Sequence, residues 1–432
     1  MQRNMRILSA LRIAAPILLL AGCSSEARLG SSDPEVGASE DSDNSPSQSA
    51  ESQGGEGSSS SASDIPEAVL GLVGDGSEGS ASLELVYQAP TNVFCMDQSS
   101  VECVGLAADL GFNPVREGEL WVVYRQPYNG QGCSETVRAG CALLPSRVAI
   151  LDDATVANPN AQVMEDGNAW HFMRVASAIA FGEDDTFTTV GEHRTGNFTD
   201  GATDFMGPTW WSSDPDVFAV DFNRNGSHLD MLHGTPYGMG VAHQEGTVYW
   251  AYNGNRGSLD RYVWNTPHVP GGDDHSDGEL SRYLDGELGL RVVNTPSHLE
   301  FAEDNVTLYV VDTANQRVLA VDTSTGQDEG RILTPDPQLQ DPRLMGGASF
   351  TELVSPGNLE VPSGIAVFGE YVIVSDTLTS LIHVFDAEGE EVTALDTGLP
   401  SGSLAGIEVG PDGKLYGVNW NEASVFRIEV DR

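Results

Sequence analysis

Basic residues are scarce in this chain. It has 21 lysines and arginines against 64 aspartates and glutamates in 432 residues, which gives a formal net charge of −43 at pH 7. Nucleic-acid binding requires a positive surface, so this balance excludes that class of function, and it also opposes direct adsorption on anionic lipid. The composition fits a protein in a salty or external medium, or one that collects cations.

The N-terminal apolar run is too short to span a bilayer. It covers residues 13–20, follows a basic start and closes with Leu20-Ala21-Gly22-Cys23. These features are typical of a processed export signal. The closing tetrapeptide resembles a bacterial lipobox, which implies a signal peptide over residues 1–22 and a lipid, such as palmitate, on Cys23. Ser24 and Ser25 follow, and that resembles an outer-membrane address in the cell envelope. The alternative is an ordinary secretory signal with an incidental cysteine.

Cysteines are few, five in all, and four of them lie beyond the leader. They form two closely spaced pairs, Cys95 with Cys103 and Cys133 with Cys141. Four cysteines allow three pairings, and the short spacing favours the two local ones because small loops close at low entropic cost. Disulfides require an oxidising compartment, which agrees with export. A metal site is the weaker interpretation, because the pairs contain no C-x-x-C motif.

The segment after the leader has almost no aromatic or branched apolar residues. From residue 24 to about residue 64 it consists mostly of serine, glycine, acids and proline. Such a segment cannot bury enough surface to offset its ordering entropy. We therefore expect a disordered tether over residues 23–80, between a lipid anchor and a folded domain at 81–432.

No long stretch beyond the tether has helical apolar spacing. Instead a short apolar phrase, clearest at residues 362–367, occurs six times, and a second strand-like run follows each copy. A unit repeated at roughly 30 to 60 residues marks a repeat architecture. We predict an all-β fold, a six-bladed β-propeller. The expected first strands are residues 103–108, 176–181, 236–241, 296–301, 362–367 and 404–409, and the expected third strands are 147–152, 217–221, 317–322, 381–386 and 424–428.

The ends of the repeat region indicate how the ring closes. The last unit ends at Arg432 without room for a fourth strand, and a strand-like run at residues 82–87 precedes the first unit. We predict that this early strand completes the sixth blade, which removes an exposed sheet edge.

The fourth and fifth units resemble NHL repeats, on the strength of residues 308–318 and 362–385. The resemblance implies a six-bladed propeller but no single activity, because the family includes scaffolds, ligand binders and enzymes. Residues 207–210, Gly-Pro-Thr-Trp, are similar to the opening motif of the gluconolactonase family, more weakly. Met206 stands where that family has a metal-binding glutamate, and Pro296-Ser297-His298 replaces its Pro-Asn-Gly, so two metal ligands are missing.

Three ionisable residues lie on expected first strands, which border the channel of a propeller. His298 stands where four other phrases have glycine and one has alanine, and Glu300 follows two residues later. Glu408 holds the matching position in the last unit. These residues and His233 are candidates for holding a cation or a polar ligand. The alternative is that they only fill the channel.

A long insert after Trp264 is rich in histidine and acids. Mixed ligands of this kind suit a divalent metal such as Ca²⁺ or Zn²⁺, although no cofactor is firmly implied. The pattern resembles a calcium loop only in part, because Leu284 occupies its twelfth position. A solvated acidic loop is the alternative. The candidate ligands are His268, Asp273, His275 and Asp277.

Two functions fit these observations. The first is a lipid-anchored propeller of the bacterial cell envelope that binds a protein, peptide or glycan ligand. The second is a metal-dependent hydrolase or lyase with its site at the channel mouth, near His233, His298 and Glu300. The sequence contains no Gly-x-Ser-x-Gly elbow, phosphate loop or His-Glu-x-x-His motif that would decide for a known enzyme chemistry.

Overall fold

Six β-sheets of four to six strands make up the part of the chain that the computed structural model describes. The described residues are 65–89, 106–125, 146–196, 205–220, 225–334, 336 and 338–431. The chain divides into two units, and all of these residues belong to the second, Ser58–Arg432. The signal peptide, Cys23, the tether up to residue 64 and the paired cysteines Cys95, Cys103, Cys133 and Cys141 lie outside them. In the described part, no helix is long and apolar enough to cross a membrane.

Each sheet is one blade, and its first three strands lie side by side in sequence order from the first strand outward. Blade 1 consists of β2 (Leu106–Phe112), β3 (Leu120–Arg125), β4 (Arg147–Leu151) and β5 (Ala161–Met164). Blade 2 consists of β6 (Ala176–Phe181), β7 (Thr186–Gly191), β8 (Thr209–Ser212) and β9 (Asp230–Met231). The first four strands of blade 3 are β10 (Gly238–Glu245), β11 (Val248–Asn253), β12 (Ser258–Val263) and β13 (Glu279–Tyr283). Blades 4 to 6 contain β14 (Leu299–Phe301), β15 (Thr307–Asp312), β16 (Arg317–Asp322), β19 (Ser349–Val354); β20 (Pro362–Phe368), β21 (Tyr371–Asp376), β22 (Leu381–Phe385), β23 (Glu391–Asp396); and β24 (Leu404–Val409), β25 (Leu415–Asn419), β26 (Ser424–Val430), β1 (Ala81–Gln88).

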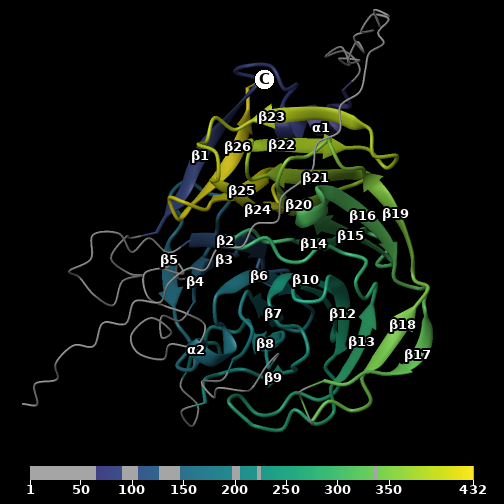
Figure 1. Cartoon of the computed structure of the whole chain (residues 1–432). Coiled ribbons are helices and arrows are strands. Elements are labelled where there is room, and N and C mark those ends of the chain that lie inside the picture. Colours follow the sequence, from purple (N-terminus) through teal and green to yellow (C-terminus); the bar gives the residue numbers. More distant parts are fainter. Residues whose placement is uncertain are drawn as a thin grey trace, which may run out of the picture. The chain divides into compact units, whose positions relative to one another are not determined.

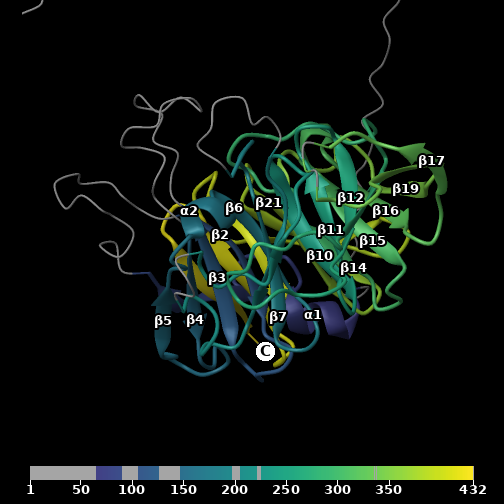
Figure 2. The same cartoon turned by 90° about the horizontal axis from the view of Figure 1, so that it is seen from below.

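The first strands form a closed ring. They contact one another in the cycle β2, β6, β10, β14, β20, β24 and back to β2. Figure 1 shows these strands at the centre and β5, β9, β13 and β23 at the periphery, and in Figure 2 β3, β4 and β5 run side by side within blade 1. The predicted six-bladed β-propeller is therefore confirmed.

Glycine in the repeated phrase allows the first strands of neighbouring blades to approach closely. A Cβ atom on Gly364 would lie 2.3 Å from the carbonyl oxygen of Ala405, and one on Gly240 would lie 2.1 Å from that of Ser297. No side chain fits at such distances, so glycine is required there. The narrow ring that results brings residues of different blades together in the channel.

The ring closes as predicted. β1 pairs antiparallel with β26 from Ala81 opposite Val430 to Gln88 opposite Ser424. The guanidinium of Arg427 on β26 is 2.6 Å from the Glu84 carboxylate on β1. The N-terminal strand thereby covers the edge of the last blade, which would otherwise expose unpaired backbone groups.

The expected tether is too long at its C-terminal end. Residues 67–73 form helix α1 (Glu67–Val73), and Val69, Leu72 and Val73 are buried on it. These side chains pack in one apolar cluster with residues of blades 5 and 6, including Ile382. The composition of residues 23–80 as a whole concealed this short apolar helix, whose stability comes from packing on the propeller.

The third strand of blade 2 is also corrected. It is β8 (Thr209–Ser212), whereas residues 217–220 of the expected strand 217–221 form a turn in which the N–H groups of Val217 and Phe218 donate to Asp214 O. The apolar pattern is nevertheless real, because Phe218 is fully buried in the core of blade 2. Alternating apolar residues predict a strand because their side chains are buried, but a turn can bury an apolar side chain equally well.

Blade 3 has two additional strands that come from a distant insert. The hairpin of β17 (Gln327–Arg331) and β18 (Arg343–Gly346) leaves the chain between β16 and β19, and β18 pairs in parallel with β13. Its tip brings Asp336 and Gln338 to the junction of blades 2 and 3, where helix α2 (Ala169–Phe172) also lies near the histidines described below. A single-turn helix, η1 (Thr313–Asn315), connects β15 to β16.

Candidate functional site

A cavity of about 710 Å³ occupies one end of the propeller channel. All six first strands contribute to its wall, together with the turns that join the first and second strands of blades 1, 2 and 4. Small-molecule sites commonly measure about 300–1,000 Å³. The cavity is therefore large enough for a metabolite-sized ligand.

The wall of this cavity is strongly acidic. Among the described residues that line it there is no lysine or arginine. Low-dielectric walls that carry one sign of charge concentrate the field and raise the local concentration of ions of the opposite sign. The acids are Asp109, Glu183, Asp184, Glu300, Glu303 and Glu408, and the histidines are His243 and His298.

The structure adds Asp109 to the expected channel residues. In blade 1 the position of the phrase's isoleucine lies three residues later than the phrase at 103–108 suggested: it is Asp109, which pairs with Val123, two residues before the end of β3. Ile407 has the same relation to the end of β25. Asp109 thus occupies the position of a core isoleucine. An acid within the apolar run 106–112 was the signal in the sequence.

Asp109 is buried and held by backbone N–H groups. Leu110 donates to its Oδ1 and Ile179 to its Oδ2, both at 2.9 Å, and His298 Nδ1 is 3.5 Å from Oδ1. Burial raises the pKa of Asp109, while His298 and the two backbone donors act in the opposite direction. Asp109 thereby joins β2 to β6 and to His298, the residue before β14.

Glu300 on β14 and Glu408 on β24 face the same channel, as expected. Burial, reinforced by the charge of Asp109, raises the pKa of Glu300 to about 8, against the weaker effect of the Phe301 N–H. Burial also raises the pKa of Glu408 well above its usual range, with further contributions from Glu300 and Asp109. No hydrogen bond from a described residue reaches the Glu408 carboxylate. Both groups therefore favour a partner that carries positive charge or donates hydrogen bonds.

His298 also lies where the sequence placed it. Its Nε2 is 3.1 Å from the carbonyl oxygen of Ser177, which can only accept, so Nε2 carries the hydrogen. Its Nδ1 faces Asp109. His298 thereby connects blade 4 to blades 1 and 2 across the channel.

His233, in contrast, does not join the channel residues. It follows β9, its ring stacks on Phe205 at 3.5 Å between centroids, and its Nδ1 is 2.7 Å from Asp336 Oδ2. Burial lowers the pKa of His233 despite the opposing effect of Asp336. The buried pair closes the contact between blade 2 and the β17–β18 hairpin.

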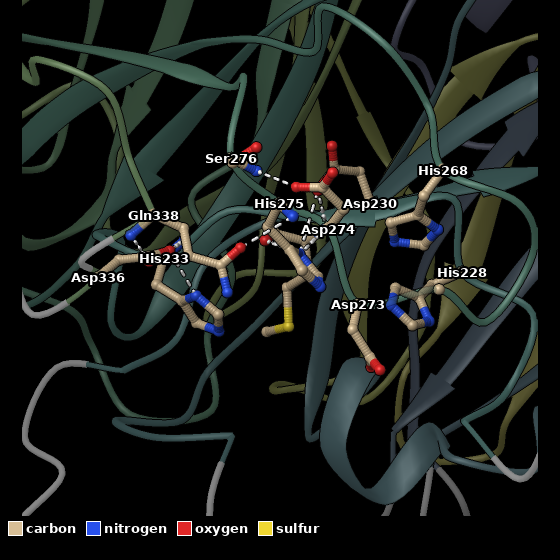
Figure 3. A network of polar contacts seen from close by, with 12 residues as sticks. His228, Asp230, His233, His268, Asp273, Asp274, His275, Ser276, Asp336 and Gln338 are labelled. Atoms are coloured by element: carbon tan, nitrogen blue, oxygen red, sulfur yellow. Dashed lines mark hydrogen bonds and ion pairs between the residues drawn. The ribbon is translucent and has the colours of Figure 1, made fainter.

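Two of the four proposed metal ligands come together, with a third histidine that the sequence analysis missed. His228, His268 and His275, hereafter the histidine cluster, place one ring nitrogen each within 4.8 Å of one another. Figure 3 shows His228 beside His268, with His275 next to them. His228 lies 40 positions before His268 in the sequence, so only the packing of blade 2 against blade 3 reveals it.

Asp273 and Asp277 are not part of the cluster. Asp273 Oδ1 accepts a hydrogen bond from Asn225 Nδ2 at 2.8 Å in an exposed position. Asp277 accepts from Asn265 through its backbone carbonyl. The acid close to the histidines is instead Asp230, fully buried on β9, whose Oδ1 is 3.1 Å from His275 Nδ1.

The histidines of the cluster differ in basicity. Burial, together with the charges of the other two rings, lowers the pKa of His228 to about 2, and burial lowers that of His268. Burial alone would lower the pKa of His275, but its hydrogen bond to Asp230 and the charge of that residue outweigh this effect and raise it.

No family model and no curated protein matches this chain. Solved structures with a similar course of the chain include an auxiliary nutrient binding protein from Bacteroides ovatus, with 10% identity and a TM-score of 0.47 over 82% of this chain and 78% of that one. A calcium-binding regucalcin from Agrobacterium tumefaciens has 13% identity and a TM-score of 0.43 over 76% and 91% of the two chains. A streptogramin B lyase has 10% identity and a TM-score of 0.43 over 82% of this chain and 100% of that one. Likeness at this level carries no inference about function.

Proposed function

We propose that this protein is a lipid-anchored propeller of the bacterial cell envelope that binds a small, positively charged organic ligand in the channel cavity. The observation that carries the proposal is the wall of that cavity, where six acids are unmatched by any lysine or arginine among the described lining residues. A cationic ligand relieves the mutual repulsion of these acids and supplies the partner that Glu408 lacks.

The spacing of the acids favours an extended ligand over a single metal ion. In the described part of the chain, the histidine cluster is the one group of three possible metal ligands with donor atoms within 4.8 Å of one another. The channel carboxylates form no such group among the described residues. An amine or guanidinium ligand with several donor groups can reach them separately.

Calorimetry of the purified mature protein with spermidine and with CaCl₂ tests this proposal. We expect heat with spermidine, and at least a tenfold loss of affinity in the Glu300→Gln/Glu408→Gln variant, because a tenfold change corresponds to about 1.4 kcal/mol, less than one charge-assisted hydrogen bond. Glu388→Gln is the control, since Glu388 is exposed in the turn between β22 and β23. The proposal is wrong if spermidine gives no heat or if the double variant binds like the wild type.

The envelope location depends on the leader and the paired cysteines. We expect the N-terminal peptide of the mature protein to carry lipid on Cys23 and the protein to enter the detergent phase, and both properties to disappear in Cys23→Ser. Alkylation before and after reduction tests the disulfides, which agree with export. Four thiols that react without reduction would exclude them at Cys95, Cys103, Cys133 and Cys141.

Catalysis in the same cavity is the second candidate. A general acid or base works best when its pKa lies near the operating pH, and the pKa of Glu300, raised to about 8, meets this condition beside His298 and Asp109. A hydrolase or lyase should convert a cationic substrate with a rate that falls at least a hundredfold in Glu300→Gln, in line with general acid–base contributions of about 10²–10⁴. A ligand recovered unchanged after prolonged incubation with the protein argues against it.

A further inference from the structure

The histidine cluster lies at the outer edge of blades 2 and 3 and takes no part in the channel. His228 lies two residues before β9, and His268 and His275 belong to the insert between β12 and β13. We propose that the cluster is a separate metal site that binds one Zn²⁺ ion through the Nε2 atoms of His228, His268 and His275. It shares no residue with the cavity wall and does not depend on the function proposed for that cavity.

The hydrogen bonds of the three rings leave all three Nε2 atoms free. Each Nδ1 faces a backbone carbonyl oxygen, which can only accept a hydrogen bond, so each Nδ1 carries the hydrogen and each Nε2 carries a lone pair. At His275 the Met231 N–H also lies 3.0 Å from Nδ1, but it is closer to Asp230 Oδ1, at 2.7 Å, and donates there. Histidines that bind metals typically donate their second ring N–H to a carbonyl or carboxylate in this way. The acceptors are Asn225 O at 3.2 Å for His228, Val269 O at 2.7 Å for His268 and Met231 O at 2.5 Å for His275.

Polar atoms in the cluster lack the partners that buried polar atoms normally have. The Nε2 atoms of His228 and His268 and the Oδ2 of Asp230 are buried without a hydrogen-bond partner among the described residues. The side chains of His228 and Asp230 are themselves completely buried. Buried polar groups of folded proteins are almost always bonded, so unpaired lone pairs on neighbouring rings call for a shared electron-pair acceptor. A metal cation satisfies this requirement.

Asp230 completes the site from behind His275. Its Oδ1 accepts from the Met231 N–H at 2.7 Å and lies 3.1 Å from His275 Nδ1. A carboxylate in this position orients a metal-binding imidazole and makes it a better donor. The buried negative charge also offsets part of the charge of the ion.

Three imidazole nitrogens select the kind of metal. Calcium and magnesium prefer oxygen ligands, whereas imidazole suits zinc and neighbouring transition metals. Nitrogens bound to Zn²⁺ lie about 2 Å from the ion and hence roughly 3–4 Å from one another. The observed limit of 4.8 Å requires only a small inward rotation. His268 and His275 are partly exposed on the insert and can make it.

Zinc at this position would fasten the insert to the body of the propeller. The backbone contacts between them are few: His268 N donates to Leu229 O at 3.1 Å, and Gly271 N donates to His228 O at 2.9 Å. From the other side, Gln338 on the β17–β18 hairpin accepts from His275 N at 3.0 Å. One ion bound to both ends of the insert and to blade 2 therefore stabilises the junction of blade 2, blade 3 and the hairpin.

Titration of untagged, metal-free mature protein with ZnCl₂ tests the proposal, with CoCl₂ as a spectroscopic probe. We expect one Zn²⁺ per chain with a micromolar or lower Kd and a visible Co²⁺ spectrum of nitrogen ligation. His268→Ala should abolish both, and Asp230→Asn should weaken binding about 10- to 100-fold. His243→Ala is the matched control, because His243 is a partly exposed histidine of the cavity wall.

The variants separate loss of the site from loss of the fold. His228 is fully buried and stacked on Phe172, so its replacement can unfold the protein. His268→Ala and His275→Ala change partly exposed residues, and an unchanged thermal transition without zinc shows that they are folded. Zinc should raise the melting temperature of the wild type and of His243→Ala but not that of His268→Ala. The proposal fails if the wild type binds no zinc at micromolar concentration, or if His268→Ala binds it as tightly as the wild type.

Discussion

Replacement of Glu300 by glutamine should stabilise the folded protein at neutral pH while it weakens ligand binding. Burial in the channel and the charge of Asp109 raise the pKa of Glu300 from 4.5 to about 8. The unfolded chain releases this proton near its ordinary pKa, whereas the folded protein retains it up to about pH 8. Between these two pKa values the free energy of unfolding therefore falls as pH rises. Above the higher pKa this loss of stability stays constant.

The expected size follows from the shift. Each pH unit between the two pKa values costs the folded state about 1.4 kcal/mol, so the loss from pH 4.5 to neutral pH is at most about 3 kcal/mol. Glu300 is partly exposed to the cavity, and water there screens the effect, so we expect Glu300→Gln to gain about 1–3 kcal/mol at neutral pH. That gain corresponds to roughly 1–4 °C in melting temperature for a domain of this size.

Thermal unfolding of the wild type and of Glu300→Gln, followed by circular dichroism from about pH 4 to about pH 9, measures this difference. The two proteins should have the same stability below the unfolded pKa, and the variant should become the more stable one as pH rises. Glu303→Gln, at the exposed rim of the same cavity, is the control and should change little at any pH. The reasoning is refuted if Glu300→Gln is no more stable than the wild type at about pH 8, or if its advantage is the same at about pH 4.

Three further predictions concern the fold. Deletion of β1 (Ala81–Gln88) exposes the edge of blade 6 and should lower the melting temperature by at least about 10 °C, whereas a change below about 2 °C would contradict the closure. The guanidinium of Arg125 and the carboxylate of Glu192 form a buried ion pair at 2.8 Å, so Glu192→Gln leaves Arg125 buried without its counter-charge. The free energy of unfolding in urea should fall by about 3–5 kcal/mol, and an unchanged midpoint would contradict a stabilising role of the pair. Leu72→Ala should cost about 2–4 kcal/mol because Leu72 is buried on α1, and no change would mean that the helix belongs to the tether after all.

Local patterns in the sequence sufficed for the architecture. Strand runs bounded by glycine, aspartate and proline repeat at a recognisable interval, and each blade is built from neighbouring segments, so the number of blades and most strand positions could be predicted. The closing strand could be predicted too, because the last unit lacks a fourth strand. The errors arose where burial does not imply a strand, as at Phe218 in its turn, or where a short apolar helix such as α1 gains its stability from packing on distant residues.

The composition of the two sites was decided by the tertiary structure. Asp109 and Glu300 are nearly two hundred positions apart in the sequence, and Glu300 and Glu408 are about one hundred apart. These residues line the same cavity only because the ring closes and brings their first strands together. His228, His268 and His275 meet because blade 2 packs against an insert of blade 3. Side-chain convergence depends on the packing of whole blades, which residue spacing does not contain. The sequence by itself therefore determined that six blades surround a channel, and only the fold decided which side chains share each site.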